Sequence, residues 1–225
     1  MPHSIPNGET ELAFVSSSPD VARGVAGIIL AGGRSRRMGT NKAMLPVPGA
    51  ISRTFVEQLA TLLAAMCPEV LLVARDETSG QEYSSLSSVC WRLVYDHIPD
   101  QGPLMGLASG LRATTLSHAL VMAVDLPCVQ PTLLAWLAAL PLTDEILIPR
   151  VHGIPQVLLA RYPRAILPTI EACLREGRRD PRALLDRAPV RFLEEEQLRV
   201  TDPELRSFMN VNTPEDFEQA RTSFR

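Results

Sequence analysis

The stretch that decides the fold is AGIIL at residues 26–30, followed by AGGRSRRMGTNK at residues 31–42. The first part is apolar and contains β-branched side chains, which is typical of a strand buried in a parallel sheet. The second part opens with Gly32 and Gly33, where the backbone can turn sharply because neither residue has a Cβ atom. Their N–H groups can then lie against an anion. The sequence therefore predicts a buried strand that ends in a phosphate-binding loop.

Positive charge is concentrated in this loop, where Arg34, Arg36, Arg37 and Lys42 fall within nine residues. Cations beside accessible backbone N–H groups favour a phosphate ligand, and Lys42 is a point charge suited to a phosphate that gains charge during transfer. Arg37 is a second candidate for that task. A surface turn with solvated cations is the alternative, and it applies most to Arg34 and Arg36.

The loop matches neither of the two common phosphate motifs. A P-loop has Gly-Lys-Ser/Thr in succession, but here Thr40 and Asn41 separate Gly39 from Lys42. The dinucleotide pattern GxGxxG is also absent from the loop. A different class of nucleotide site is indicated.

Composition sets the broad class of the protein. The chain has 225 residues, of which 46% are hydrophobic and 21% charged, as in one soluble globular domain. A formal net charge of -3 and a pI of about 5.8 give no overall attraction to nucleic acid. Cys67, Cys90, Cys128 and Cys173 are widely spaced and form no CxxC pair, which favours reduced thiols over a disulfide or a zinc site.

The N-terminal residues differ in composition from the rest. Residues 1–24 are polar and rich in turn formers, and they lack the basic start and apolar run of a signal peptide. We expect them to form a disordered extension before a domain at residues 25–225. No uncharged apolar stretch reaches the roughly 18 residues of a membrane span. We therefore expect a cytoplasmic protein without a membrane or nucleic acid partner.

Strands and helices alternate along the domain. Short apolar runs predict strands at residues 26–30, 70–74, 91–95, 119–124, 145–149, 156–160, 190–193 and 208–212. Helical spacing of apolar residues, small-residue runs, or a capping residue before proline predict helices over 52–66, 102–111, 131–140 and 163–175 and after Asp180 and Thr213. The polar residues 75–88 are expected to form a long connection.

This alternation predicts an α/β fold with a doubly wound, mostly parallel sheet and helices on both faces. Ligands of such sheets bind beyond the carboxyl ends of the strands. The loop at residues 31–42, called the glycine loop below, follows a predicted strand, and so do Asp96 and Asp125. The topology therefore brings three segments that are distant in sequence to one edge of the sheet.

The two acids at this edge have candidate roles of their own. Asp125 follows an apolar strand and precedes Leu126 and Pro127, and its carboxylate could hold Mg²⁺ against nucleotide phosphates. A helix N-cap is the alternative for Asp125. Asp96 could contact a ligand at the same edge, or it could be an ordinary acid in a turn.

The pattern LAGGxSxRMGxxK at residues 30–42 resembles the signature of the small nucleotidyltransferases. Its Ala-Gly-Gly form is most similar to the molybdenum cofactor guanylyltransferases. The element DLP at 125–127, the segment from Asp96 to GPL at 102–104, and NVNTPEDF at 210–217 are similar to segments of that family. The resemblance covers nearly everything after residue 25 and implies a nucleotidyltransferase domain with the fold of the nucleotide-diphospho-sugar transferases.

The resemblance also implies roles for individual residues. It makes Lys42, Arg37 and Asp125 catalytic, with Asp125 as the magnesium ligand. Arg75 stands roughly where relatives carry a base-contacting asparagine. The nucleotide-binding candidates are Leu30, Ala31, Gly32, Gly33, Lys42, Arg75, Asp96 and Asp125.

Four residues nearer the C-terminus are candidates for binding the second substrate. Asn210 and Asn212 would face one side of an extended segment, because strand side chains repeat every two residues. They could face a pterin or complete a metal shell, or make only local turn hydrogen bonds. Arg178 and Arg179 lie in a GRR segment similar to one in the family. They could meet a substrate phosphate, or be exposed cations at a helix end.

The resemblance implies transfer of GMP from GTP to molybdenum-bound molybdopterin, with Mg²⁺ as cofactor and pyrophosphate as product. The pterin could be handed over by other cofactor-biosynthesis proteins. A cytidylyltransferase acting on molybdopterin or on a sugar or polyol phosphate is the rival, because the loop indicates a triphosphate more clearly than a base. Small Ala31 and Gly32 leave room for a purine and favour guanine. A nucleotide-binding regulator without turnover is the alternative of another class.

Overall fold

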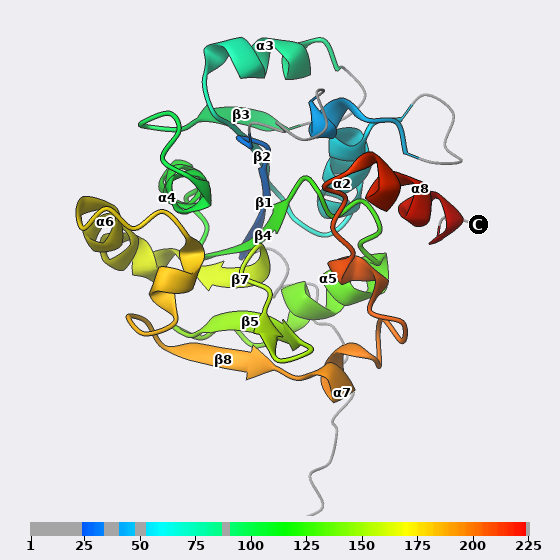
Figure 1. Cartoon of the computed structure of the whole chain (residues 1–225). Coiled ribbons are helices and arrows are strands. Elements are labelled where there is room, and N and C mark those ends of the chain that lie inside the picture. Colours follow the sequence, from blue (N-terminus) through cyan, green and yellow to red (C-terminus); the bar gives the residue numbers. More distant parts are fainter. Residues whose placement is uncertain (1–23, 34–40, 48–52, 87–90, 224–225) are drawn as a thin grey trace, which may run out of the picture.

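The computed structural model describes residues 24–33, 41–47, 53–86 and 91–223. In Figure 1 they form one twisted sheet with helices on both sides. The strand order is β3-β2-β1-β4-β7-β5-β6, and β8 pairs with β5. The strands are β1 (Val25–Leu30), β2 (Val70–Ala74), β3 (Arg92–Tyr95), β4 (His118–Ala123), β5 (Ile146–Val151), β6 (Ile154–Pro155), β7 (Leu159–Pro163) and β8 (Val190–Leu193).

Four parallel strands form the half of the sheet that matters for the site. β1 lies between β2 and β4, and Ile28 pairs in register with Leu71 on one side and Val121 on the other. Every residue of β1, β2 and β4 is buried, as expected for strands covered on both faces. The chain goes from β1 outward to β2 and β3, then returns to place β4 on the other side of β1. Such a reversal of strand order opens a crevice at the carboxyl ends.

Two helices cover each face of the sheet. α2 (Phe55–Ala64) and α5 (Pro131–Ala139) lie on one face, and α4 (Pro103–Ala113) and α6 (Leu167–Arg175) on the other (Figure 1). Each pair buries its own hydrophobic cluster against the sheet. The α/β fold expected from the sequence, with helices on both faces, is confirmed.

Glycines on α4 set how closely this helix approaches β1. A Cβ added to Gly110 would come within 2.9 Å of the side chain of Ile28, and one added to Gly106 within 3.3 Å of Leu30. The helix therefore packs with its backbone against the strand. This brings the N-terminus of α4, at Pro103, to the carboxyl edge of the sheet.

The other half of the sheet is mixed rather than parallel. β7 runs antiparallel to both β4 and β5, because the chain turns back through a tight hairpin at His152 and Gly153 instead of a helical crossover. The strand expected at 156–160 begins three residues later, as β7. Among the described strands, the β8–β5 pair and the β3-β2-β1-β4 half keep the parallel arrangement.

The expected connection at 75–88 contains a helix, α3 (Glu77–Ser84). The side chain of Asp76 accepts a hydrogen bond from the amide of Ser79, and the hydroxyl of Ser79 accepts one from the amide of Asp76. This capping box starts the helix. Only Gly80 and Tyr83 of α3 are buried, so the segment has no apolar periodicity to mark it.

The C-terminal part also departs from expectation in places. Residues 208–212 form no strand: η4 (Arg206–Phe208) is a 3-10 helix, and an irregular extended segment follows it. The expected helix at 163–175 is divided into η2 (Arg164–Ile166) and α6. The helix after Asp180 is the 3-10 helix η3 (Pro181–Leu184), and the helix after Thr213 is α8 (Pro214–Ser223).

Several expectations fall on residues that the structure does not describe. These are the N-terminal extension, apart from Gly24, the loop cations Arg34, Arg36 and Arg37, and Cys90. Cys67, Cys128 and Cys173 are buried thiols, and burial raises the pKa of Cys67 to about 12. Across the described residues, every helix is too short or too polar to cross a membrane.

Candidate functional site

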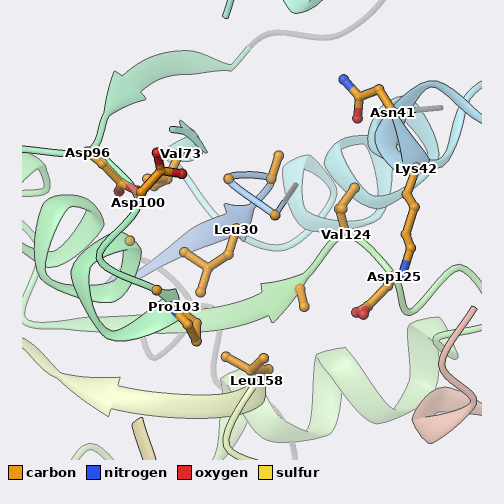
Figure 2. Close-up of a pocket in the computed structure, with 16 residues that line it drawn as sticks. Leu30, Asn41, Lys42, Val73, Asp96, Asp100, Pro103, Val124, Asp125 and Leu158 are labelled. Atoms are coloured by element: carbon orange, nitrogen blue, oxygen red, sulfur yellow. The ribbon is translucent and has the colours of Figure 1, made fainter. Parts of the chain in front are cut away.

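A pocket of about 280 Å³ opens at the carboxyl ends of β1, β2 and β4, where the strand order reverses. Figure 2 shows Asp96 and Asp100 at one end of this pocket and Lys42 and Asp125 at the other. The residues that line it are Leu30, Ala31, Gly32, Gly33, Asn41, Lys42, Val73, Asp96, Asp100, Gly102, Pro103, Gly106, Ala123, Val124, Asp125 and Leu158.

Lys42 lies at the same end of the pocket as Asp125, and its ammonium group points toward Asp125 in Figure 2. Its Nζ donates a hydrogen bond of 2.6 Å to Oδ1 of Asn212, a residue 170 positions away in sequence. Lys42 begins the short 3-10 helix η1 (Lys42–Met44). This hydrogen bond therefore ties the start of η1 to the C-terminal segment beside Asp125.

Asp125 presents a partly buried carboxylate to the same end. Its Oδ1 is buried and has no hydrogen-bond partner among the described residues. Burial raises the pKa of Asp125, and the nearby charge of Lys42 opposes that shift. A buried polar atom without a partner costs free energy, so a ligand that bonds to this oxygen would recover it.

The C-terminal segment holds Asp125 in place through its backbone. The amide of Val211 donates to the carbonyl of Asp125 at 2.9 Å. Asp216 accepts from the amides of Asn212 and Thr213, and these bonds hold the pKa of Asp216 below its usual value. This fixes the turn that carries Asn212. Asn212 thus reaches Lys42, whereas Asn210 is exposed, and neither asparagine lines the pocket itself.

Asp96 and Asp100 form the end of the pocket opposite Lys42 and Asp125. Oδ1 of Asp96 is buried without a hydrogen-bond partner among the described residues, and its Oδ2 lies 3.5 Å from where a Cβ on Gly32 would be. Burial raises the pKa of Asp96 to about 7, and the charges of Asp100 and Asp76 add to that shift. The Ser109 hydroxyl acts in the opposite direction. This carboxyl group therefore changes its charge near neutral pH.

Residues 30–33, where the glycine loop begins, form the wall between these ends. Leu30, Ala31, Gly32 and Gly33 all line the pocket, as expected. The backbone of Arg75 approaches Gly32, since its amide nitrogen lies 3.5 Å from a Cβ placed there. The side chain of Arg75 turns instead to Asp76, with a 2.7 Å ion pair, and does not line the pocket.

Arg178 and Arg179 lie beside the pocket rather than in it. The carbonyl of Arg179 accepts from the amide of Leu104 at 3.0 Å, which ties this segment to the start of α4. Both arginine side chains are exposed, and neither lines the pocket. Arg37 lies outside the described residues.

Sequence reasoning missed several residues of the site. Asp100 and Asn41 line the pocket, as do Pro103 of the GPL segment and Leu158. Asn41 had a usable signal, because it directly precedes Lys42 and asparagine is a common N-cap. Leu158 had none, since it reaches the site only through the antiparallel return of β7.

A pocket at the strand-order reversal of an α/β sheet, with a glycine loop as its wall and an amine and a carboxylate at one end, defines a nucleotide-binding domain of the nucleotidyltransferase type. The chain belongs to the MobA-like NTP transferase family, since residues 27–192 match the MobA-like NTP transferase domain. It is a nucleotidyltransferase of that family.

Relatives and solved structures agree with this assignment. The chain is 36% identical over 197 residues to a probable molybdenum cofactor guanylyltransferase of Chloroflexus aggregans, covering 86% of this chain and 92% of the relative. It is 31% identical to the molybdenum cofactor guanylyltransferase of Desulfosudis oleivorans, covering 89% and 96%. The crystal structure of molybdopterin-guanine dinucleotide biosynthesis protein A from Archaeoglobus fulgidus matches with a TM-score of 0.75 and 28% identity, covering 88% and 97%.

Proposed function

We propose that this protein transfers GMP from GTP to molybdenum-bound molybdopterin, forming the guanine dinucleotide cofactor and pyrophosphate. One observation carries the proposal: the pocket has Lys42 and the partly buried carboxylate of Asp125 at one end and the partly buried carboxylate of Asp96 at the other, and each carboxylate has a buried Oδ1 without a hydrogen-bond partner among the described residues. The end with Lys42 and Asp125 suits phosphates, and the end with Asp96 suits a base with N–H donors. Relatives at 31% and 36% identity carry the name guanylyltransferase, which supports the same substrate.

The choice of guanine rests on Asp96. Guanine presents an N1–H and an N2 amino group on one edge, and an ionised carboxylate can accept both hydrogen bonds. Cytosine and adenine each present a single amino donor beside an acceptor nitrogen that would face the carboxylate. A site that pairs its buried polar groups with one ligand discriminates against analogues that leave them unpaired. The small residues Ala31 and Gly32 leave room for both purine rings beside Asp96.

The other end of the pocket suits the triphosphate and a magnesium ion. Mg²⁺ is usually held by one or two carboxylates together with substrate phosphates and water. The described residues bring no three His, Cys, Asp or Glu side chains together as a metal cluster. Asp125 fits the role of the single protein carboxylate, because its buried Oδ1 has no partner within the described part of the chain. A bound Mg²⁺ would neutralise phosphate charge there.

The chemistry follows from positioning and charge. An oxygen of the terminal phosphate of the pterin attacks the α-phosphorus of GTP in line, and a new P–O bond forms as the bond to the bridging oxygen breaks. The electron pair of that bond leaves with pyrophosphate. Lys42 and the loop N–H groups stabilise the negative charge on the phosphates. Asn212 holds the Lys42 ammonium in place, and no covalent enzyme intermediate is required.

The acceptor substrate would enter beside the C-terminal segment. Asn212 lies at the phosphate end, with exposed Asn210 two residues before it. Arg178 and Arg179 have exposed side chains, and the backbone of their segment is hydrogen-bonded to the start of α4. We assign these residues to the pterin and its phosphate, while other cofactor-biosynthesis proteins deliver the pterin.

The test is turnover with each nucleotide. Purified protein is incubated with Mg²⁺, molybdenum-bound molybdopterin and GTP, CTP or ATP, and pyrophosphate release and product mass are measured. We expect release with GTP and the mass of the guanine dinucleotide. Turnover with CTP at least as fast as with GTP would replace the proposal by a cytidylyltransferase. The protein could also bind nucleotide without releasing pyrophosphate, whether the acceptor offered is molybdopterin, a sugar phosphate or a polyol phosphate. That result would indicate a regulator.

A further inference from the structure

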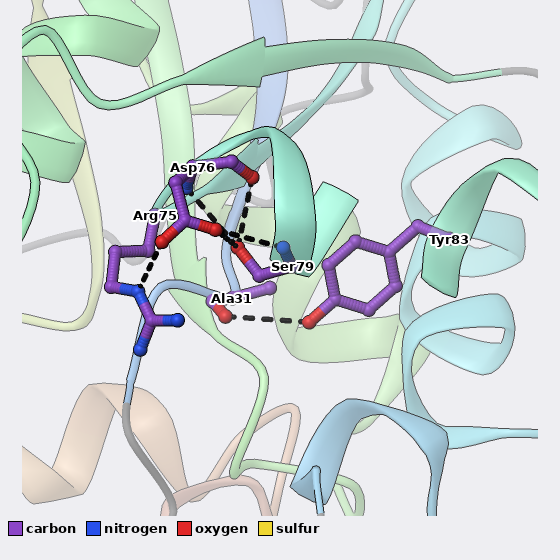
Figure 3. Close-up of polar contacts among 5 residues, drawn as sticks. All are labelled: Ala31, Arg75, Asp76, Ser79 and Tyr83. Atoms are coloured by element: carbon purple, nitrogen blue, oxygen red, sulfur yellow. Dashed lines mark hydrogen bonds and ion pairs between the residues drawn. The ribbon is translucent and has the colours of Figure 1, made fainter. Parts of the chain in front are cut away.

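The two ends of the glycine loop meet at one buried hydroxyl group. Tyr83 of α3 is 1% exposed, and its hydroxyl donates to the carbonyl of Ala31 at 3.4 Å, where the loop begins. The same oxygen accepts a 3.1 Å hydrogen bond from the side-chain amide of Asn41, where the loop ends. Figure 3 shows Tyr83 reaching from its helix to Ala31. One side chain therefore contacts both ends of the segment that carries the phosphate-binding residues.

Asn41 connects this contact to Lys42. Its Oδ1 accepts from the amide of Ala43 at 3.1 Å and so caps η1, the turn that begins at Lys42. Its Nδ2 donates to Tyr83 and, at 2.6 Å, to Glu82. The side chain directly before the catalytic lysine is thus fixed on one side to its own turn and on the other to α3.

α3 is a firm support for this contact, although it is short and polar. The capping box of Asp76 and Ser79 fixes its first turn, and Arg75 pairs with Asp76 (Figure 3). A Cβ on Gly80 would lie 2.5 Å from the ring of Tyr95, so the helix backbone lies directly against β3. Gly80 and Tyr83 are the buried residues of α3. The close packing at Gly80 therefore determines where Tyr83 projects.

We propose that Tyr83 is a positioning residue of the transferase: through Asn41 it sets the place of Lys42 relative to the nucleotide phosphates. The proposal rests on the proposed role of Lys42. The 3.1 Å bond to Asn41 is the stronger contact, because 3.4 Å is long for an O–H···O hydrogen bond. A tyrosine hydroxyl is protonated at neutral pH and can donate, and burial raises the pKa of Tyr83 further.

The first test is a thermodynamic cycle on GTP binding. Tyr83→Phe removes one hydroxyl and keeps the buried ring, and we expect it to weaken GTP affinity about threefold to tenfold, the worth of one hydrogen bond. In a Lys42→Ala background the same change should weaken affinity less than twofold, because contacts that act through one group are not additive. Equal losses in both backgrounds would overturn the proposal.

A second readout needs no substrate. The amides of Ala43, Met44 and Leu45 are hydrogen-bonded within the Asn41 turn, so their hydrogen exchange reports on that turn. We expect Tyr83→Phe to speed their exchange about threefold or more in nucleotide-free protein. If wild-type protein bound no GTP, the proposed function would fail while this measurement still tested the contact. Unchanged exchange would overturn the positioning role.

Two further variants separate positioning from general stability. Tyr162→Phe removes another buried hydroxyl, that of Tyr162 on β7, which donates to the carbonyl of Val157 at 2.7 Å. It should leave exchange at residues 43–45 unchanged even if it lowers the free energy of unfolding. Asn41→Ser keeps a capping oxygen for η1 but loses both donations to α3, and it should reproduce the Tyr83→Phe effects. If Tyr162→Phe gave the same exchange change, the effect would be general and the proposal wrong.

Discussion

Asp125 and Asp96 are the same residue type at comparable places, yet their surroundings give them different chemistry. Each follows a strand of the parallel half of the sheet, and each has a buried Oδ1 without a hydrogen-bond partner among the described residues. Burial raises the pKa of both. Asp125 faces Lys42, whose charge opposes the shift, whereas Asp96 has Asp100 and Asp76 nearby, whose charges increase it.

Under the proposed function, this difference would let one pocket bind two unlike parts of a nucleotide. A carboxylate beside an ammonium group is held toward its charged form and suits a cation and phosphates. A carboxylate among other carboxylates, with a pKa of about 7, is sensitive to N–H donors that favour its charged form. The neighbours of each acid therefore decide which part of the nucleotide it would bind.

Asp125→Asn should have the largest effect on this comparison. The amide keeps the shape but removes the charge that we assign to Mg²⁺, and we expect turnover to fall about a thousandfold, since metal stabilisation of charge is worth several kcal/mol. Turnover is measured over a Mg²⁺ titration, with the metal removed by EDTA as the zero point. Wild-type turnover in the variant, or in EDTA, would remove Asp125 and Mg²⁺ from the proposed site.

Lys42→Ala should come next. Loss of a positioned charge on the phosphates should lower kcat/KM about a hundredfold, while the free energy of unfolding should fall by only about 1 kcal/mol, because the variant also loses the hydrogen bond to Asn212. Arg112→Ala is the matched control. Arg112 is an exposed cation at the end of α4 far from the pocket, and it pairs with Glu171 of α6. Near-wild-type activity of Lys42→Ala would contradict its assignment.

Asp96→Asn tests the base end. We expect GTP affinity to fall about tenfold to fiftyfold, as for a lost hydrogen bond to a charged group, and CTP affinity to change little. Inosine triphosphate is the matched probe because it lacks only the 2-amino group of guanine. Wild-type protein should prefer GTP over ITP, and the variant should bind both equally. An unchanged GTP preference would place base recognition elsewhere.

The pH dependence of binding gives a smaller effect. Only ionised Asp96 can accept both donors of guanine, so GTP affinity should rise with pH up to about 7, by at most tenfold per pH unit, and then level off. Calorimetric titrations from pH 5.5 to 8.5 measure this slope. Asp96→Asn is the control, because GTP itself also titrates in this range, and the variant reports that contribution alone.

The sequence was sufficient for the half of the molecule where apolar strands alternate with helices. β2 has the predicted bounds and β1 begins one residue early, and parallel topology brings Asp96 and Asp125 to one edge, as predicted. Residues 208–212 alternate like a strand, but the amide of Val211 bonds to the carbonyl of Asp125 and not to a neighbouring strand. Tertiary contacts of this kind leave no pattern in the sequence.

α3 was missed for a different physical reason. Its stability comes from a capping box and from the packing of Gly80 and Tyr83, while the rest of the helix is polar. The spacing of Asp76 and Ser79 was the available signal. Arg75 shows the same limit at the site, because its ion pair with the adjacent Asp76 turns it away from the pocket lining where a base contact was expected.

The smallest effect concerns the stability of the nucleotide-free protein. Between about pH 4 and pH 7 the unfolded chain has lost the proton of Asp96 while the folded protein retains it. The folded state binds more protons in this window, so the free energy of unfolding should decrease as pH rises through it. Carboxylates with lowered pKa, such as Asp76, change stability in the opposite direction at lower pH.

Comparing wild type with Asp96→Asn cancels the contributions of those other carboxylates. The difference in unfolding free energy between the two proteins is measured by urea titration at several pH values. It should shift steadily in favour of the variant up to pH 7. A constant difference would mean that Asp96 ionises normally in the folded protein, and the contrast with Asp125 would disappear.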